Sequence, residues 1–186
     1  KTITYFTLLF SLLIGAQDFR DNVQNIVTNN IGDPNADFGY ASSIYGNKIA
    51  IGARGEISNT TSDETGAVYI YEKQSTNNWT YLYRYSPNDG ASGDEFGYSV
   101  DIFENTTVVG ARKHDKNSVN DFGAAYVYEL DNNGILIREQ KLISPTNALN
   151  TVNFGHSVSI YQNYIVVGAL YDIAQNAGSV PGSVYI

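Results

Sequence analysis

The stretch that decides the fold is "EFGYSVDIFENTTVVGARK", residues 95–113, because its pattern occurs three times in the chain. An earlier copy is "DFGYASSIYGNKIAIGARG" at 37–55, and a later copy is "NFGHSVSIYQNYIVVGALY" at 153–171. The Phe-Gly pairs of the copies begin 58 residues apart in both steps, at Phe38, Phe96 and Phe154. The glycines near the end of each copy keep the same step: Gly52, Gly110 and Gly168. Such constant spacing identifies an internal structural repeat.

Each copy opens a unit that reads as four short strands. "YSVDIF" alternates in polarity and places Val100 and Ile102 on one face, as a half-buried strand does. "TVVGA" and "KIAIGA" are continuous apolar runs, which are typical of strands covered on both faces. "GAVYIYE" and "WTYLYRYS" supply a third and a fourth strand rich in β-branched and aromatic residues, and no sustained helical period follows residue 16. Four repeated strands predict an all-β fold, a β-propeller of four-stranded antiparallel blades.

The repeat divides the chain into predicted segments. We expect blades at residues 38–95, 96–153 and 154–186, the last one truncated. Lys1, an apolar run and the small residues Gly15 and Ala16 predict a signal peptide over residues 1–16. The alternative is a buried strand or helix of the domain. Residues 17–37 are expected to form an N-terminal strand, the outer strand of the last blade, followed by a linker.

Composition excludes several classes of partner. A net charge of -8 argues against nucleic-acid binding and against docking on anionic membranes. The absence of cysteine excludes disulfides and thiolate metal sites. Three glycosylation sequons fit a secreted chain: Asn59, Asn78 and Asn105. We therefore expect localisation outside the cell, as a secreted protein or on the cell surface.

Phe-Gly, a Ser-Val-like strand and then Val-Val-Gly-Ala resemble the FG-GAP repeat of integrin α-subunit propellers and related secreted proteins, over residues 38–186. The resemblance implies a propeller of about seven blades, about three of them present here, used for extracellular recognition. Arg54, Arg112 and Leu170 stand where the motif has proline. The connections "YGNK", "ENTT" and "YQNY" have too few carboxylates for Ca²⁺. We expect the short, calcium-loop-free variant of the repeat, with no metal and no cofactor.

The sequence offers little support for catalysis. "GHSVS", residues 155–159, resembles a nucleophile elbow but lacks its final glycine, and the repeat aligns its serine with structural serines. The two histidines, His114 and His156, show no zinc-site spacing. We predict that the protein is not an enzyme.

Long loops on a rigid scaffold are the usual place for binding residues. In a propeller, the second-to-third and fourth-to-first connections share one face, and here they are the long ones. The predicted ligand-binding residues are Arg54, Arg112, Lys113, His114, Tyr171 and Asp172 in these loops, with Tyr40, Tyr98 and His156 near the axis. The alternative for each is an ordinary solvated loop position, as we expect of the loop around His114.

The first functional hypothesis is a propeller that binds an extracellular protein or glycan in cell adhesion or matrix contact. A second subunit is a further candidate partner, whereas nucleic acid and direct membrane insertion are not expected. Two alternatives come from other classes: a non-catalytic accessory propeller of a larger secreted hydrolase, and a structural coat protein.

Overall fold

The computed structural model describes Ile26 and residues 35–57, 63–75, 78–116, 119–131, 133–146, 151–172 and 182–186. All the described strands belong to the second of the chain's two compact units, Ile31–Ile186. The predicted signal peptide and Asn59 lie outside the described residues, as does nearly all of the predicted N-terminal strand.

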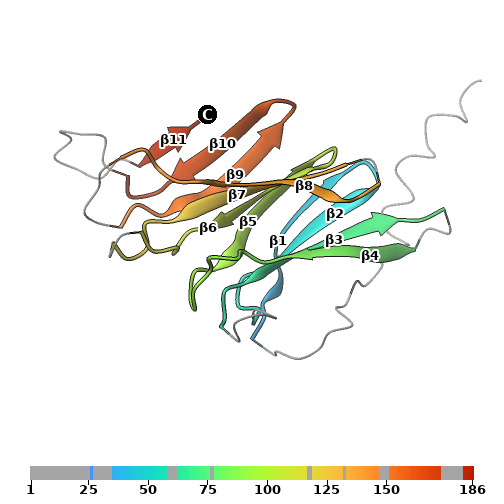
Figure 1. The fold of residues 1–186 in the computed structure, drawn as a ribbon, viewed down its shortest axis with the longest axis horizontal. Helices are drawn as coiled ribbons and strands as arrows, with labels where there is room; N and C mark the ends of the chain where they lie inside the picture. Colours follow the sequence, from blue (N-terminus) through green and yellow to red (C-terminus); the bar gives the residue numbers. More distant parts are fainter. Residues whose placement is uncertain are drawn as a thin grey trace, which may run out of the picture. The chain divides into compact units, whose positions relative to one another are not determined.

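The described strands form three sheets that follow one another along the sequence (Figure 1). The first sheet has the order β1 (Phe38–Tyr45), β2 (Lys48–Ala53), β3 (Ala67–Lys73) and β4 (Trp79–Tyr85). The second has the order β5 (Phe96–Phe103), β6 (Thr106–Ala111), β7 (Ala124–Leu130) and β8 (Leu136–Leu142). The third contains β9 (Phe154–Tyr161), β10 (Tyr164–Ala169) and β11 (Ser183–Tyr185).

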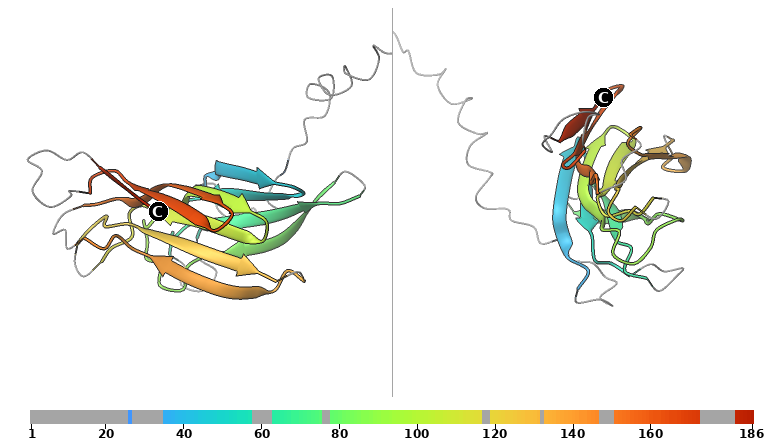
Figure 2. Two further views of the ribbon diagram at one scale, coloured as in Figure 1. Left: turned by 90° about the horizontal axis from the view of Figure 1, so that it is seen from above. Right: turned by 90° about the vertical axis from the view of Figure 1, so that its left-hand side faces the viewer.

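Every sheet is an antiparallel meander, so the all-β, blade-like architecture is confirmed. The first strands of the three sheets are neighbours, with β5 in contact with both β1 and β9. Figure 2 shows the same succession of sheets from two further directions. In the described ranges, no helix is long and apolar enough to cross a membrane.

Burial along the strands follows the polarity pattern of the sequence. Val100 and Ile102 are both buried, as their alternation predicted. β6 is buried from Thr107 onward, which confirms a strand covered on both faces. The tyrosines of β7 differ from expectation, because we placed their hydroxyls in water and the structure buries both side chains. The hydroxyl of Tyr128 donates to Glu139 Oε1 at 3.3 Å, and burial raises its pKa.

Phe-Gly and Gly-Ala serve the contact between neighbouring sheets. A Cβ atom at Gly52 would overlap the carbonyl oxygen of Gly97 in the next sheet, and Gly110 makes the same close approach to Gly155. Gly97 has a φ of 90°, a left-handed conformation that favours glycine. The preceding Phe96 is fully buried, with its ring edge-on to Tyr126 at 5.4 Å. The repeated phrase therefore builds the interface between blades.

The long connections gather at one end of the sheets, as the propeller topology predicted. The amide of Gly93 donates to Glu64 O at 3.0 Å, which joins the fourth-to-first connection to the second-to-third connection. The amide of Lys113 likewise donates to Asp94 O at 3.2 Å. This end of the sheets carries the candidate binding residues.

Candidate ligand-binding face

An aromatic row runs across the first strands of the three sheets. Tyr40, Tyr98 and His156 each stand two residues after the repeated phenylalanine, on β1, β5 and β9. The ring centroids of Tyr40 and Tyr98 are 5.1 Å apart, and those of Tyr98 and His156 are 5.3 Å apart. The structure thus brings together the three side chains that the repeat placed near the axis.

Two arginines lie on this row. Arg54 and Arg112 directly follow β2 and β6, whose last residues pair with the repeated phenylalanines. Each guanidinium carbon lies 4.0 Å from the centroid of a ring, Arg54 over Tyr40 and Arg112 over Tyr98. This geometry is a cation–π contact, which restricts the rotation of a long side chain and holds its charge at the surface.

Acidic residues that the sequence analysis missed complete the pattern. Asp37 and Glu95 directly precede Phe-Gly, with φ values of 52° and 58°. Asp37 Oδ2 lies 2.9 Å from Arg54 Nε, and Glu95 Oε2 lies 2.6 Å from Arg112 Nε. Their spacing of 58 residues was the signal that could have found them.

Glu95 is the centre of a charge cluster that spans two blades. Its Oε1 atom lies 2.9 Å from Lys113 Nζ and 3.6 Å from Arg54 Nη1 of the preceding blade. Burial alone would raise the pKa of Glu95, but hydrogen bonds from Arg112 and Lys113 outweigh it and lower the pKa below its model value of 4.5. We define the Arg–Tyr face by these side chains: Asp37, Tyr40, Arg54, Glu95, Tyr98, Arg112, Lys113 and His156.

The charges of the Arg–Tyr face do not cancel. Three cations, Arg54, Arg112 and Lys113, face the two carboxylates of Asp37 and Glu95, which leaves one positive charge on a chain whose net charge is -8. His156 adds no charge near neutral pH, because burial and the neighbouring Arg112 lower its pKa below the model value of 6.5. The face therefore has the opposite sign to the whole molecule.

The third blade departs from the pattern. Asn153 replaces the acidic residue, and its Nδ2 donates to Arg112 O at 2.9 Å. Leu170 stands at the arginine position, and with His156 it lines a cavity of about 290 Å³. Tyr171 is 48 % exposed, as expected of a contact residue.

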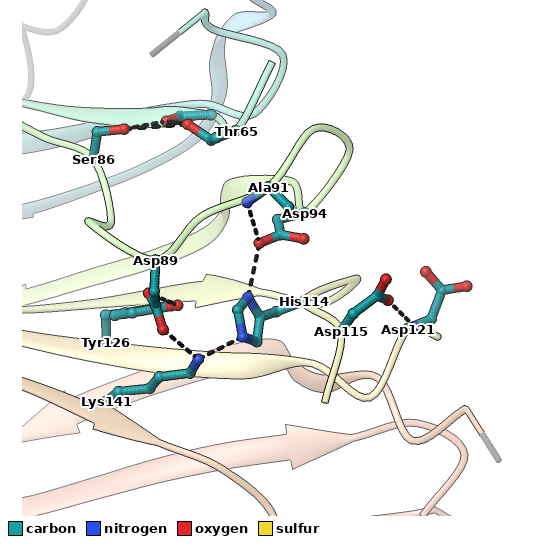
Figure 3. A network of polar contacts seen from close by, with 11 residues as sticks. Thr65, Ser86, Asp89, Ala91, Asp94, His114, Asp115, Asp121, Tyr126 and Lys141 are labelled. Carbon is teal, nitrogen blue, oxygen red and sulfur yellow. Dashed lines mark hydrogen bonds and ion pairs between the residues drawn. The ribbon is translucent and has the colours of Figure 1, made fainter. Parts of the chain in front are cut away.

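His114 requires a correction, because the solvated loop we predicted around it is wrong. The residue is only 8 % exposed, and its Nδ1 lies 2.7 Å from Asp94 Oδ2 (Figure 3). Its Nε2 contacts Lys141 Nζ, and Lys141 in turn lies 2.6 Å from Asp89 Oδ2. His114 therefore joins the loop before β5 to strand β8.

Asp172 requires the same correction. Its side chain is fully buried, not at the surface. Its Oδ2 accepts hydrogen bonds from Ser144 Oγ at 2.8 Å and from the hydroxyl of Tyr185. The carboxylate therefore ties the end of the second blade to the third strand of the next.

These two residues occupy one repeated position, 58 residues apart, whose first member is Glu56. Each member contacts the tyrosine of the adjoining third strand. Glu56 Oε1 accepts a hydrogen bond from Tyr69 at 2.9 Å, and the ring of His114 lies edge-on to Tyr126 at 6.3 Å. The position is structural, because it anchors the third strand of each blade.

A second feature missed by the sequence analysis lies on the first strands. Asp101 accepts hydrogen bonds from Ser43 Oγ at 2.5 Å and from Ser159 Oγ at 3.1 Å, which lie 58 residues before and after it. It also accepts from the amides of Ile102 and Ile160, at 2.9 and 2.8 Å. One carboxylate thus joins three blades.

Two of the predicted glycosylation sites are described. Asn78 is exposed beside β4. Asn105 is half-buried in the two-residue turn between β5 and β6, where its side-chain oxygen accepts a hydrogen bond from Lys48 Nζ. Modification at either residue stays a prediction.

The remaining chemical predictions concern metals and the serine motif. Within the described part of the chain, no group of three His, Cys, Asp or Glu side chains is placed to hold a metal ion. Ser99, the counterpart of Ser157 in "GHSVS", donates from Oγ to Gly155 O at 2.8 Å. This contact crosses a blade interface, in agreement with a structural role for the repeated serine.

Comparison with known proteins gives one match. A protein-family model described as FG-GAP repeat matches residues 79–128 and 137–186, which together exceed half of the chain. The first matched range runs from β4 through most of β7, and the second runs from β8 through β11. Each range therefore joins the fourth strand of one sheet to the strands of the next. No curated protein matches the chain.

Proposed function

The chain belongs to the FG-GAP repeat family, and on that premise we propose that it is a recognition module that binds an extracellular protein or glycan through the Arg–Tyr face. The β-propeller blades supply a rigid support, and the face presents side chains from the ends of their first and second strands. Binding on such a support loses little conformational entropy, because the contact residues are already ordered.

One observation carries the proposal: the face presents fixed cations on an acidic molecule. Arg54 and Arg112 are held by a ring on one side and a carboxylate at Nε, so little rotamer entropy remains to be lost on binding. Arginine and tyrosine are also the residues that most often dominate binding energies at protein interfaces. The excess positive charge favours a ligand with a carboxylate, from an acidic side chain or an acidic sugar.

The wider context of this proposal is cell adhesion or matrix contact by a secreted or cell-surface protein. The acidic chain and its sequons at Asn59, Asn78 and Asn105 support that setting. We also propose that the module is not an enzyme, since the face binds through fixed charges and rings and we assign no reaction to it.

The experiment measures binding of the full chain to immobilised hyaluronan and to immobilised poly-glutamate, which present sugar and peptide carboxylates. We expect saturable binding to at least one probe that weakens about tenfold in Arg112→Gln and about threefold in Lys113→Gln. Lys73→Gln is the matched control, because Lys73 is exposed at the end of β3 and outside the face. Failure to bind either probe, or equal binding by Arg112→Gln and Lys73→Gln, would refute the proposal.

A further inference from the structure

The third sheet has an open edge where the other two sheets have a fourth strand. β3 pairs with β4 and β7 pairs with β8, whereas β11 is paired on one side only among the described residues. The open side of β11 presents backbone donors and acceptors that an extended segment can pair with.

A buried carboxylate beside this edge is incompletely paired. Oδ2 of Asp172 accepts two hydrogen bonds, but Oδ1 has no partner within the described structure, although the side chain is fully buried. A buried charged oxygen without a partner is costly, and the cost disappears when a cation reaches it.

The first two blades show where such a cation comes from. Arg84 on β4 stands opposite Tyr69 in the sheet, and its Nη2 lies 3.9 Å from Glu56 Oε1. Lys141 on β8 stands opposite Tyr126, and its Nζ contacts His114 Nε2. In both blades a basic residue of the fourth strand reaches the repeated position that Asp172 occupies in the third.

Apolar space adjoins the same edge. A cavity of about 340 Å³ lies beside β11 and is lined by Leu142, Phe154, Val167 and Tyr185, among others. It offers apolar contact for residues that flank the basic one, as Tyr83 and Tyr85 flank Arg84 on β4.

We propose that the open edge of β11 is a docking site for an extended peptide segment with a lysine or arginine flanked by apolar residues. The segment pairs antiparallel with β11 and places its basic residue opposite Tyr185. Its cation then contacts Oδ1 of Asp172, and the net charge of -8 adds general attraction for a basic segment. This inference does not depend on the Arg–Tyr face, which lies at other residues.

The test uses a fluorescent peptide, NWTYLYRYSP, with the sequence of residues 78–87, and measures its anisotropy with the full chain. We expect saturable binding, about tenfold weaker for the peptide that carries Arg84→Gln. In the Asp172→Asn chain, the two peptides should bind within about twofold of each other, because the charge that selects between them is gone. Amide chemical shifts of Ser183–Tyr185 should change on binding, which locates the contact.

Three results would overturn the proposal. The first is no binding by the wild-type peptide, and the second is equal binding of the arginine and glutamine peptides by the wild-type chain. The third is self-association of the chain that the peptide does not displace, because a second copy would then cover the edge. The peptide substitution keeps the test decisive even when Asp172→Asn does not fold.

Discussion

Replacement of Asp101 gives the most direct test of how the blades are held together. In Asp101→Ala, the amide of Ile160 loses its carboxylate acceptor, and the residue is buried. An unsatisfied buried donor costs about 1–3 kcal/mol, and each lost hydrogen bond from Ser43 and Ser159 about 0.5–1 kcal/mol. We expect the free energy of unfolding to fall by about 3 kcal/mol, a large share of a typical stability of about 5–15 kcal/mol.

A conservative variant separates charge from hydrogen bonding. Asp101→Asn keeps one acceptor oxygen but turns an NH₂ group toward Ser159 or toward Ser43. The serine hydroxyl can reverse its role and accept, whereas a backbone amide facing NH₂ cannot. We therefore expect Asp101→Asn to cost about 1–2 kcal/mol, between the wild type and Asp101→Ala.

The assay is urea denaturation followed by circular dichroism, with the midpoint compared at constant slope. Ser43→Ala and Ser159→Ala should each cost below about 1 kcal/mol, and Glu64→Ala, at an exposed acidic residue, is the control for loss of charge. A loss below about 1 kcal/mol in Asp101→Ala, or equal losses in the alanine and asparagine variants, would refute the reasoning.

Three further predictions concern the interface, acid and alkali. Gly110→Ala should destabilise the fold by more than about 3 kcal/mol in thermal unfolding, because the new Cβ overlaps the carbonyl of Gly155, while Gly39→Ala, with open space around it, should cost only about 1–2 kcal/mol of backbone strain. Glu95 has a lowered pKa, so its stabilisation is complete above pH 4.5 and is lost as the pH falls through the folded value; Glu95→Gln should flatten the acid limb of the stability profile. Burial raises the pKa of Tyr69 to about 12, so its contribution is complete below pH 10 and is lost toward pH 12, and Tyr69→Phe should remove one group from the absorbance titration of tyrosinate.

The repeat could be predicted from the sequence because it depends on spacing, and spacing is visible without coordinates. Phe96 and Gly97 recur with the strands around them, so strand type, burial of Val100 and the close packing of glycine all followed. The row of Tyr40, Tyr98 and His156 followed from the same alignment.

The wrong predictions concern the direction of side chains in loops. His114 and its neighbour Lys113 are adjacent and polar, yet Lys113 reaches Glu95 at the surface and His114 turns inward to Asp94. Polarity alone does not distinguish these two cases, because a buried histidine is acceptable wherever a carboxylate receives its N–H. Asp172 was misplaced for the same reason, since its buried partners come from segments distant in the sequence.

The close approach of Gly52 to Gly97, and of Gly110 to Gly155, places main chain against main chain where two sheets meet. The distance between neighbouring sheets is therefore set at these points by atoms that every residue shares, not by the size of variable side chains. Substitutions on the Arg–Tyr face can alter charge and ring chemistry while that distance stays the same. Ligand choice and sheet geometry are thus separable properties of this chain, and the first can be engineered without rebuilding the second.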